Sequence, residues 1–222
     1  MLGTHPASLM FLWKRGLFLE DYQTLLVADL HLGKDTTFRR EGLAVPRGSS
    51  AQTLRCVMEM VRETNAKDVI ILGDLFHART SLSAEICELF ADFLRSLSSV
   101  HVTLVKGNHD RSAGPTPRDW PLQVIESELR RGPYQLSHFP GVASPEYPLR
   151  IAGHTHPAVR LRGEMQYEGK LPCFHFDSHQ RCLTLPAVGD FTGTQRIHPE
   201  PDDRIWVITG EEVIELNPKL ID

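Results

Sequence analysis

The sequence of 222 residues has few cysteines and no long apolar run, and both absences exclude classes of protein. The four cysteines form no CxxC pair and no zinc-knuckle spacing, which argues against a disulfide scaffold and a structural zinc site. Cys173 and Cys182 could face each other across a hairpin, but reduced, partly buried thiols are the expected state in a cytosolic chain. No apolar stretch reaches the roughly 18 residues of a membrane span, so no membrane association is expected.

The chain also lacks a secretory signature, a basic surplus and internal repeats. A short apolar run at 9–13 has no basic start before it and no small-residue cleavage site after it, so a cytoplasmic location is expected. The formal net charge of −4 argues against a generally basic surface for nucleic acid but leaves room for a local basic strip. No linker-like tract divides the chain, and residues 1–222 are therefore expected to form a single domain.

The first half of the chain alternates strand-type and helix-type patterns. An opening β-hairpin is expected at 9–13 and 17–20, because a Gly-containing turn separates two apolar runs. Apolar residues at helical spacing predict amphipathic helices at 49–63 and 83–97, the second with Ser83 as its N-cap. Further strands are expected at 24–28, 69–72 and 101–105. This alternation favours parallel pairing through right-handed crossovers.

The second half becomes predominantly β in its pattern. After a Pro-rich loop, residues 121–131 are expected to be helical. Short apolar runs then predict strands at 134–136, 149–152, 158–161, 173–176, 182–185 and 205–208. These strands suggest a meander that completes a second sheet, so the expected fold is α/β with two stacked sheets and helices outside.

The eleven histidines are informative because many of them directly follow apolar strands. Five segments share this pattern, in which a strand runs straight into residue types that bind metals. Residues at the carboxyl ends of strands in α/β sheets converge on one site even when they are far apart in sequence. The polar residues at the five strand ends are Asp29, His31, Asp74, Asn108, His109, Asp110, His138, His154 and His156.

This set of side chains predicts a centre with two metal ions. Carboxylate, imidazole and amide groups form a mixed nitrogen and oxygen site suited to Mn, Fe, Co, Ni or Zn. Seven ligands among these nine residues are more than one ion with an open coordination position needs. They suit two ions roughly 3.5–4 Å apart that share a bridging carboxylate. Asp29 and His31, two residues apart in extended chain, are expected to grip one ion. His154 and His156 either do the same or divide between the two ions.

The ordered series DxH, GD, GNHD, H and GHTH at residues 29–156 resembles the calcineurin-like metallophosphoesterases. The resemblance implies a four-layer α-β-β-α sandwich of two mixed sheets flanked by helices. It also implies in-line attack on phosphorus by a hydroxide that bridges both ions, with His109 contacting the phosphate or assisting the leaving oxygen, and Asp110 orienting His109. The implied ligands are Asp29, His31 and His156 for the first ion, Asn108, His138 and His154 for the second, and Asp74 as the bridge.

A closer resemblance narrows the expected substrate. The segments 24–34, 38–40, 45–48, 72–79 and 191–193 are similar to the bacterial DNA ligase-associated metallophosphoesterases. That subfamily implies a Mn-dependent DNA endonuclease in damage response, encoded beside a DNA ligase and a helicase. Single-stranded or flexible DNA is the expected substrate, because a site sunk between loops admits a pliable strand more easily. An alternative is hydrolysis of a small phosphodiester or pyrophosphate, such as a nucleotide or nucleotide-sugar compound, which the acidic net charge slightly favours. A scaffold that has lost catalysis is disfavoured, because every ligand is present.

Several other side chains near these motifs have two interpretations each. His77 follows the second motif and either donates a hydrogen bond to a metal ligand or is an ordinary loop histidine. Phe38 either stacks a base or packs in the core. The basic residues either rim the cleft and hold a phosphate backbone or form an exposed charged face. These basic residues are Arg39, Arg40 and Arg79, together with Lys34 and Arg47.

Overall fold

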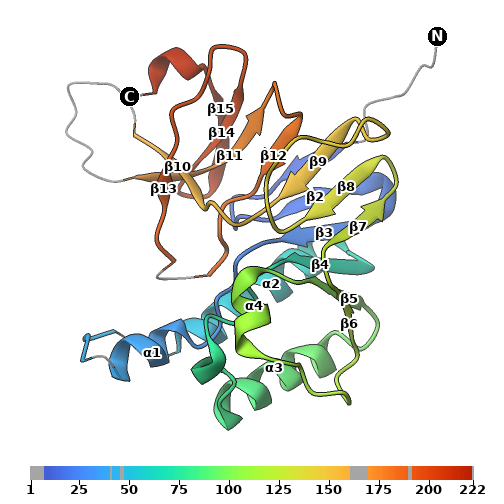
Figure 1. The fold of residues 1–222 in the computed structure, drawn as a ribbon, viewed down its shortest axis with the longest axis vertical. Coiled ribbons are helices and arrows are strands. Elements are labelled where there is room, and N and C mark those ends of the chain that lie inside the picture. Colours follow the sequence, from blue (N-terminus) through green and yellow to red (C-terminus); the bar gives the residue numbers. More distant parts are fainter. Residues whose placement is uncertain (1–7, 41, 46–47, 161–169, 190–191, 222) are drawn as a thin grey trace.

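The computed structural model describes residues 8–40, 42–45, 48–160, 170–189 and 192–221, and it contains two mixed β-sheets (Figure 1). The N-terminal hairpin and the strand after it pair antiparallel, and the later strands of the first sheet run parallel. The alternating pattern predicted this parallel pairing for the strands expected at 24–28, 69–72 and 101–105. Arg47, Leu161 and Phe191 lie outside the described residues. The first sheet has the order β1 (Leu9–Phe11), β2 (Leu17–Leu19), β3 (Thr24–Val27), β4 (Asp68–Leu72), β5 (His101–Val105) and β6 (Leu122–Ile125).

The second sheet is built from the C-terminal half of the chain. It is not the simple meander expected from sequence, because β8 pairs with β9 and β9 with β12 in parallel. On one path its order is β13 (Gln195–Arg196), β10 (Pro157–Val159), β11 (Leu171–Asp177), β12 (Cys182–Thr184), β9 (Leu149–Ala152), β8 (Tyr134–Ser137) and β7 (Glu128–Arg131). β14 (Arg204–Thr209) pairs with β11, and β15 (Glu212–Leu216) with β14.

The prediction of a helix at 121–131 is wrong, because this segment forms the strands β6 and β7, which belong to two different sheets. β6 continues the first sheet by pairing in parallel with β5, and β7 pairs antiparallel with β8. The unpaired edge of β5 supplies hydrogen-bond partners that the local pattern of the segment does not reveal. Tertiary pairing therefore overrides the weak helical periodicity.

The helices cluster against the first sheet, on the side away from the second sheet (Figure 1). They are α1 (Lys34–Arg40), α2 (Ser49–Thr64), α3 (Ala84–Ser96) and α4 (Asn108–Ala113). The described residues also form the 3-10 turns η1 (Glu20–Tyr22), η2 (Arg79–Ser81) and η3 (Pro218–Leu220), and η3 follows β15 beside the second sheet (Figure 1). α2 and α3 confirm the amphipathic prediction, and the Ser83 hydroxyl caps α3 by accepting from the Ile86 amide at 3.4 Å. Within the described residues no α-helix follows Ala113, and Ile221 packs on the outer face of the second sheet.

The alternating faces of the strands explain how the layers hold together. In β3, Leu25 points to the helix layer and Leu26 to the second sheet, and the strands beside it repeat this division. From the second sheet, Phe174 and Ile151 enter the same core between the sheets. This arrangement confirms the expected α/β fold with two mixed sheets, and it fixes the strand ends that carry the polar motifs.

The structure can be compared with the sequence at the cysteines and at the helices. Cys182 lies opposite Asp177 rather than opposite Cys173, so the disulfide considered across this hairpin does not form. Burial raises the pKa of both thiols, as expected for structural cysteines. None of the described helices combines the length and apolar character needed to cross a membrane.

Candidate metal centre

The polar motifs meet at one edge of the two sheets, where β3, β4, β5, β8 and β9 end. Parallel pairing within each sheet places the carboxyl ends of these strands together, as expected from the motif pattern. Ligand-type atoms form three groups in which all members lie within 4.8 Å of one another. The groups are Asp29 with His31 and His156, Asp74 with His138 and His154, and His31 with His77 and His109.

Five residues of the motifs adopt a left-handed backbone conformation that side chains with a Cβ rarely take. The φ angles are 55° for Asp29, 46° for His31, 50° for Asp74, 75° for His154 and 49° for His156. Such strain persists where the surrounding structure over-determines it, and it concentrates at functional sites. The extended conformation expected between Asp29 and His31 is therefore wrong, because a sharp turn brings both side chains to the same place.

The first group surrounds a buried carboxylate. Asp29 is fully buried, and one carboxylate oxygen, Oδ2, accepts the His154 backbone amide at 2.8 Å. The other oxygen, Oδ1, has no hydrogen-bond partner and lies 3.5 Å from His156 Nε2. His156 Nδ1 donates to the Gly193 carbonyl at 2.8 Å, so its Nε2 faces the group. His31 Nε2 lies 3.4 Å from His156 Nε2, which brings both rings to the same side of Asp29.

The second group is centred on His138. Its Nδ1 donates to the Leu72 carbonyl at 3.0 Å, which turns Nε2 toward the group. That nitrogen lies 3.1 Å from Asn108 Oδ1 and 3.0 Å from His154 Nδ1. Asp74 Oδ1 is 3.6 Å away, and Asp74 Oδ2 lies 3.8 Å from His31 Nε2 in the first group. Asp74 thus stands between the two groups.

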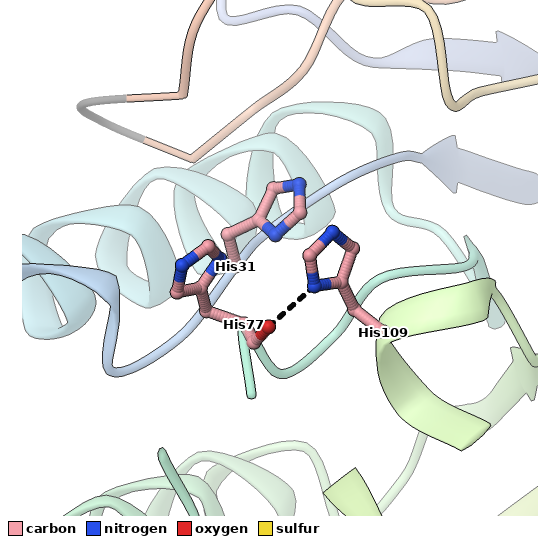
Figure 2. A group of neighbouring side chains, drawn as sticks. All are labelled: His31, His77 and His109. Atoms are coloured by element: carbon pink, nitrogen blue, oxygen red, sulfur yellow. Dashed lines mark hydrogen bonds between the residues drawn. The ribbon is translucent and has the colours of Figure 1, made fainter. Parts of the chain in front are cut away.

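The third group, shown in Figure 2, joins His31 and His77, from the segments after β3 and β4, with His109, from the first turn of α4. His109 Nδ1 donates to the backbone carbonyl of His77, which turns its Nε2 toward the centre, 3.9 Å from Asp74 Oδ2. The rings of His77 and His109 stack at 5.2 Å between centroids, and His31 meets both edge-on. His77 is therefore part of the cluster. The sequence left its role open, because nothing local links it to a residue 32 positions away.

Burial and neighbouring positive groups lower the pKa of three of these imidazoles, His31, His77 and His154. Burial, with the His156 ring next, lowers the pKa of His31 to about 2, and burial with Lys34 lowers that of His77 to about 4. The pKa of His154 is lowered by burial and by His138. Burial also lowers that of His156, but the Asp29 carboxylate outweighs it and the net shift is upward. Neutral imidazoles have lone pairs free to bind metal ions.

The glycines of the motifs leave room for ligands that come from other strands. A Cβ at Gly73, where φ is +81°, would lie 2.1 Å from His138 Nδ1. A Cβ at Gly107 would lie 2.2 Å from Asp74 Oδ1. Both distances are impossible for real atoms, so a side chain at either position would displace a candidate ligand.

Asp110 fixes the backbone around the centre rather than the ring of His109. Its carboxylate accepts the Gly107 amide at 2.9 Å and the Phe76 amide at 3.2 Å. Burial raises its pKa, and the Asp74 charge adds to this shift. These bonds tie the loop after β4 to the start of α4, and so position His109 through the main chain.

The predicted substrate-binding arginines lie in three different settings. Arg39 is bound to Asp35 at 2.9 Å within α1, and Arg79 is exposed at the start of η2. Arg40 ends α1, and its side chain lies outside the described part. Lys34, at the start of α1, is half-buried, and its Nζ lies 5.7 Å from the centroid of the Phe38 ring. The Phe38 ring in turn meets the His77 ring edge-on, with 6.4 Å between the two centroids. Through Phe38, Lys34 is thus connected to the histidine cluster.

The side chains fit divalent ions in their chemistry. Asn108 Oδ1 and His138 Nε2, two atoms of the kind that bind metal ions, converge to 3.1 Å. Asp29 Oδ1 is a buried carboxylate oxygen that accepts no hydrogen bond, and Asp74, also buried, has its pKa raised by burial and by Asp29. Converging acceptors and unpaired buried charge are costly without a cation and natural with one.

Comparisons with known proteins agree with this chemistry. The family model described as calcineurin-like phosphoesterase matches residues 22–209. The crystal structure of Pseudomonas putida nuclease MPE is similar, with a TM-score of 0.81 and 31% identity over 97% of this chain and 98% of that chain. Yfce, a phosphoesterase from E. coli, is 15% identical over 87% of this chain and 98% of that chain, with a TM-score of 0.43. No curated protein sequence matches significantly.

Proposed function

Since this chain belongs to the calcineurin-like phosphoesterase family, it is a metal-dependent phosphoester hydrolase, and we propose that its substrate is DNA in a single-stranded or flexible form. The observation that carries the catalytic part is the pair of ligand groups on either side of the buried Asp74 carboxylate. We assign Asp74 as the bridge between two ions. The ligands proposed for the first ion are Asp29, His31 and His156, and those for the second are Asn108, His138 and His154.

Two divalent ions bound there would stabilise charge on the phosphate oxygens and make a water molecule nucleophilic at neutral pH. The chain itself supplies the remaining steps. His109 presents Nε2 to the centre while its Nδ1–H is held by the His77 carbonyl, so a proton carried at Nε2 can pass to the leaving oxygen. The backbone bonds of Asp110 keep that ring in place.

The proposal of DNA as substrate has two supports. The nuclease MPE of Pseudomonas putida matches nearly the full length of both chains. On this chain, Lys34 brings a positive charge to the edge of the centre, where it could hold a phosphate of the strand. Arg79, exposed on η2, and the arginines of α1 are proposed as further phosphate contacts.

We further propose manganese as the metal and DNA repair as the setting. Two buried carboxylates with four imidazoles and an amide oxygen make a mixed donor set that accommodates Mn as well as Fe, Co, Ni or Zn. Manganese rests on the resemblance to the ligase-associated enzymes, which also motivates a functional association with a DNA ligase and a helicase.

One assay tests the substrate. Purified protein with Mn²⁺ is given circular single-stranded DNA, a chromogenic phosphodiester and a phosphomonoester side by side over a range of salt concentrations. Nicking of the circle, weakening as salt rises, is the expected result, because phosphate contacts by cationic side chains are screened. Hydrolysis of the chromogenic diester without nicking at any salt would refute the DNA substrate and favour a small nucleotide diester or pyrophosphate.

A further inference from the structure

An exposed aromatic ring lies directly on the candidate ligands of the second ion. Phe139 follows His138 at the end of β8, and its ring lies 4.7 Å from the rings of both His138 and His154. Both imidazoles meet the ring edge-on rather than stacking on it, and 40% of the residue remains exposed to solvent. Large hydrophobic side chains on the surface are common singly, but one packed against a metal centre is placed to meet the substrate.

The backbone at Phe139 is held firmly in place. Its carbonyl accepts the Ser137 hydroxyl at 2.8 Å, and the Arg150 guanidinium lies 3.5 Å from the same oxygen. Pro140 follows and restricts the conformation of the residue before it to the extended region. The ring is therefore presented by a fixed strand end, which lowers the entropy cost of using it as a binding surface.

We propose that Phe139 is a stacking platform for the nucleobase beside the scissile phosphate. This inference rests on the proposed function, because ions held by His138 and His154 would draw the phosphate to the point where Phe139 begins. A base attached to a neighbouring sugar then lies within reach of the exposed ring. Stacking on an aromatic side chain accepts any base, which suits cleavage that does not depend on sequence.

Phe139 differs from Phe38, the aromatic residue that the sequence singled out. Phe38 is half-buried in α1, packs near Lys34 and contacts His77, on the side of the third histidine group. Phe139 lies beside the other ligand group and is exposed, whereas Phe38 is half-buried. The two rings thus border different sides of the centre, and Phe139 is the one free to receive a base.

The test compares strands with and without bases. Fluorescence anisotropy with Mn²⁺ measures the affinity for a phosphorothioate oligonucleotide, which resists cleavage, and for a matched strand of abasic residues. Phe139→Ala should weaken binding of the base-containing strand about ten-fold and leave the abasic strand unchanged. The same variant should raise KM for ordinary single-stranded DNA by a similar factor with little change in kcat. Phe139→Trp should restore both values.

Val142→Ala is the matched control, because Val142 is 66% exposed in the same loop and has no role in the centre. It should behave as wild type on every strand. Equal loss of affinity for both strands in Phe139→Ala, or no loss for either, would overturn the stacking role. Failure of the wild type to cut DNA while it hydrolyses a chromogenic diester would instead refute the DNA substrate itself, so the two failures are distinguishable.

Discussion

At the scale of single residues, the centre stores backbone strain to bring its ligands together. Asp29, His31 and Asp74 all take left-handed conformations at the points where strands end. Each such conformation costs on the order of 1–3 kcal/mol, which folding must offset through the core between and beneath the sheets. The turn at Asp29 also buries a carboxylate oxygen, Oδ1, that accepts no hydrogen bond. Substitution of these residues is therefore expected to reduce the activity of the protein more than its stability.

His109 is the residue whose replacement should separate activity from folding. We expect His109→Ala to lower kcat by at least about 100-fold, because a positioned proton donor contributes roughly that much or more. Its thermal unfolding should change little, since the ring is partly exposed and packs on other imidazoles. Steady-state kinetics with Mn²⁺ and circular dichroism melting measure the two effects. His101→Ala, on an exposed histidine of β5, is the control, and near wild-type turnover in His109→Ala would refute the assigned role.

At the scale of elements, the strand-to-loop junctions position the ligands. The β4 and β5 exits lie so close together that Gly107 touches the carboxylate of Asp74, whose Oδ1 accepts the His109 amide at 3.0 Å. Asp110 closes the same junction by binding two backbone amides. A short helix, α4, then begins at Asn108, so one turn of chain carries a candidate ligand, the phosphate-facing histidine and the residue that fixes them.

Gly107→Ala tests this junction. The backbone of Gly107, with φ −90° and ψ −176°, suits alanine, so the effect comes from the clash with Asp74 alone. We expect Mn²⁺ affinity and kcat to fall roughly 10- to 100-fold, the usual cost of disturbing the residues that support metal ligands. Isothermal titration with Mn²⁺ and activity assays measure it. Gly141→Ala, whose Cβ meets open space, should behave as wild type; equal behaviour of the two variants would contradict the steric account.

At the scale of the whole molecule, the two sheets share one core and jointly hold the centre. Ligand candidates follow strands of the first sheet at Asp29, Asp74 and Asn108, and strands of the second at His138 and His154. This shared core supports the proposal that residues 1–222 form a single domain. Ions that join both sheets should therefore stabilise the entire fold.

The expected stabilisation by metal can be measured directly. Binding at 100 times Kd adds about 2.7 kcal/mol, which for a chain of this length corresponds to a rise in Tm of roughly 5–10 °C. Burial keeps the pKa of His31 near 2, so this ligand stays neutral at pH 6, but the pKa of His156 is raised above its ordinary value and this second ligand carries a proton there. The rise in Tm should therefore be smaller at pH 6 than at pH 7.5. Calorimetry with Mn²⁺ and with EDTA, at pH 7.5 and pH 6, tests this. Identical Tm values in both solutions would count against a metal centre.

The sequence predicted the parts of this molecule that are locally encoded. The candidate ligands were found because each stands in a short motif directly after an apolar strand. The contacts of His77, the backbone role of Asp110 and the placement of Phe139 depend on loops that meet only in three dimensions. The segment 121–131 was misassigned for a related reason, since its two strands are defined by partners in different sheets.

The central claim is a centre of two ions bridged by Asp74, and anomalous diffraction from crystals soaked in Mn²⁺ tests it most directly. The account predicts two anomalous peaks roughly 3.5–4 Å apart, one beside His31 and His156, the other beside His138 and His154, with Asp74 contacting both. A single peak, no peak in this cluster, or two peaks of which Asp74 contacts only one would contradict it.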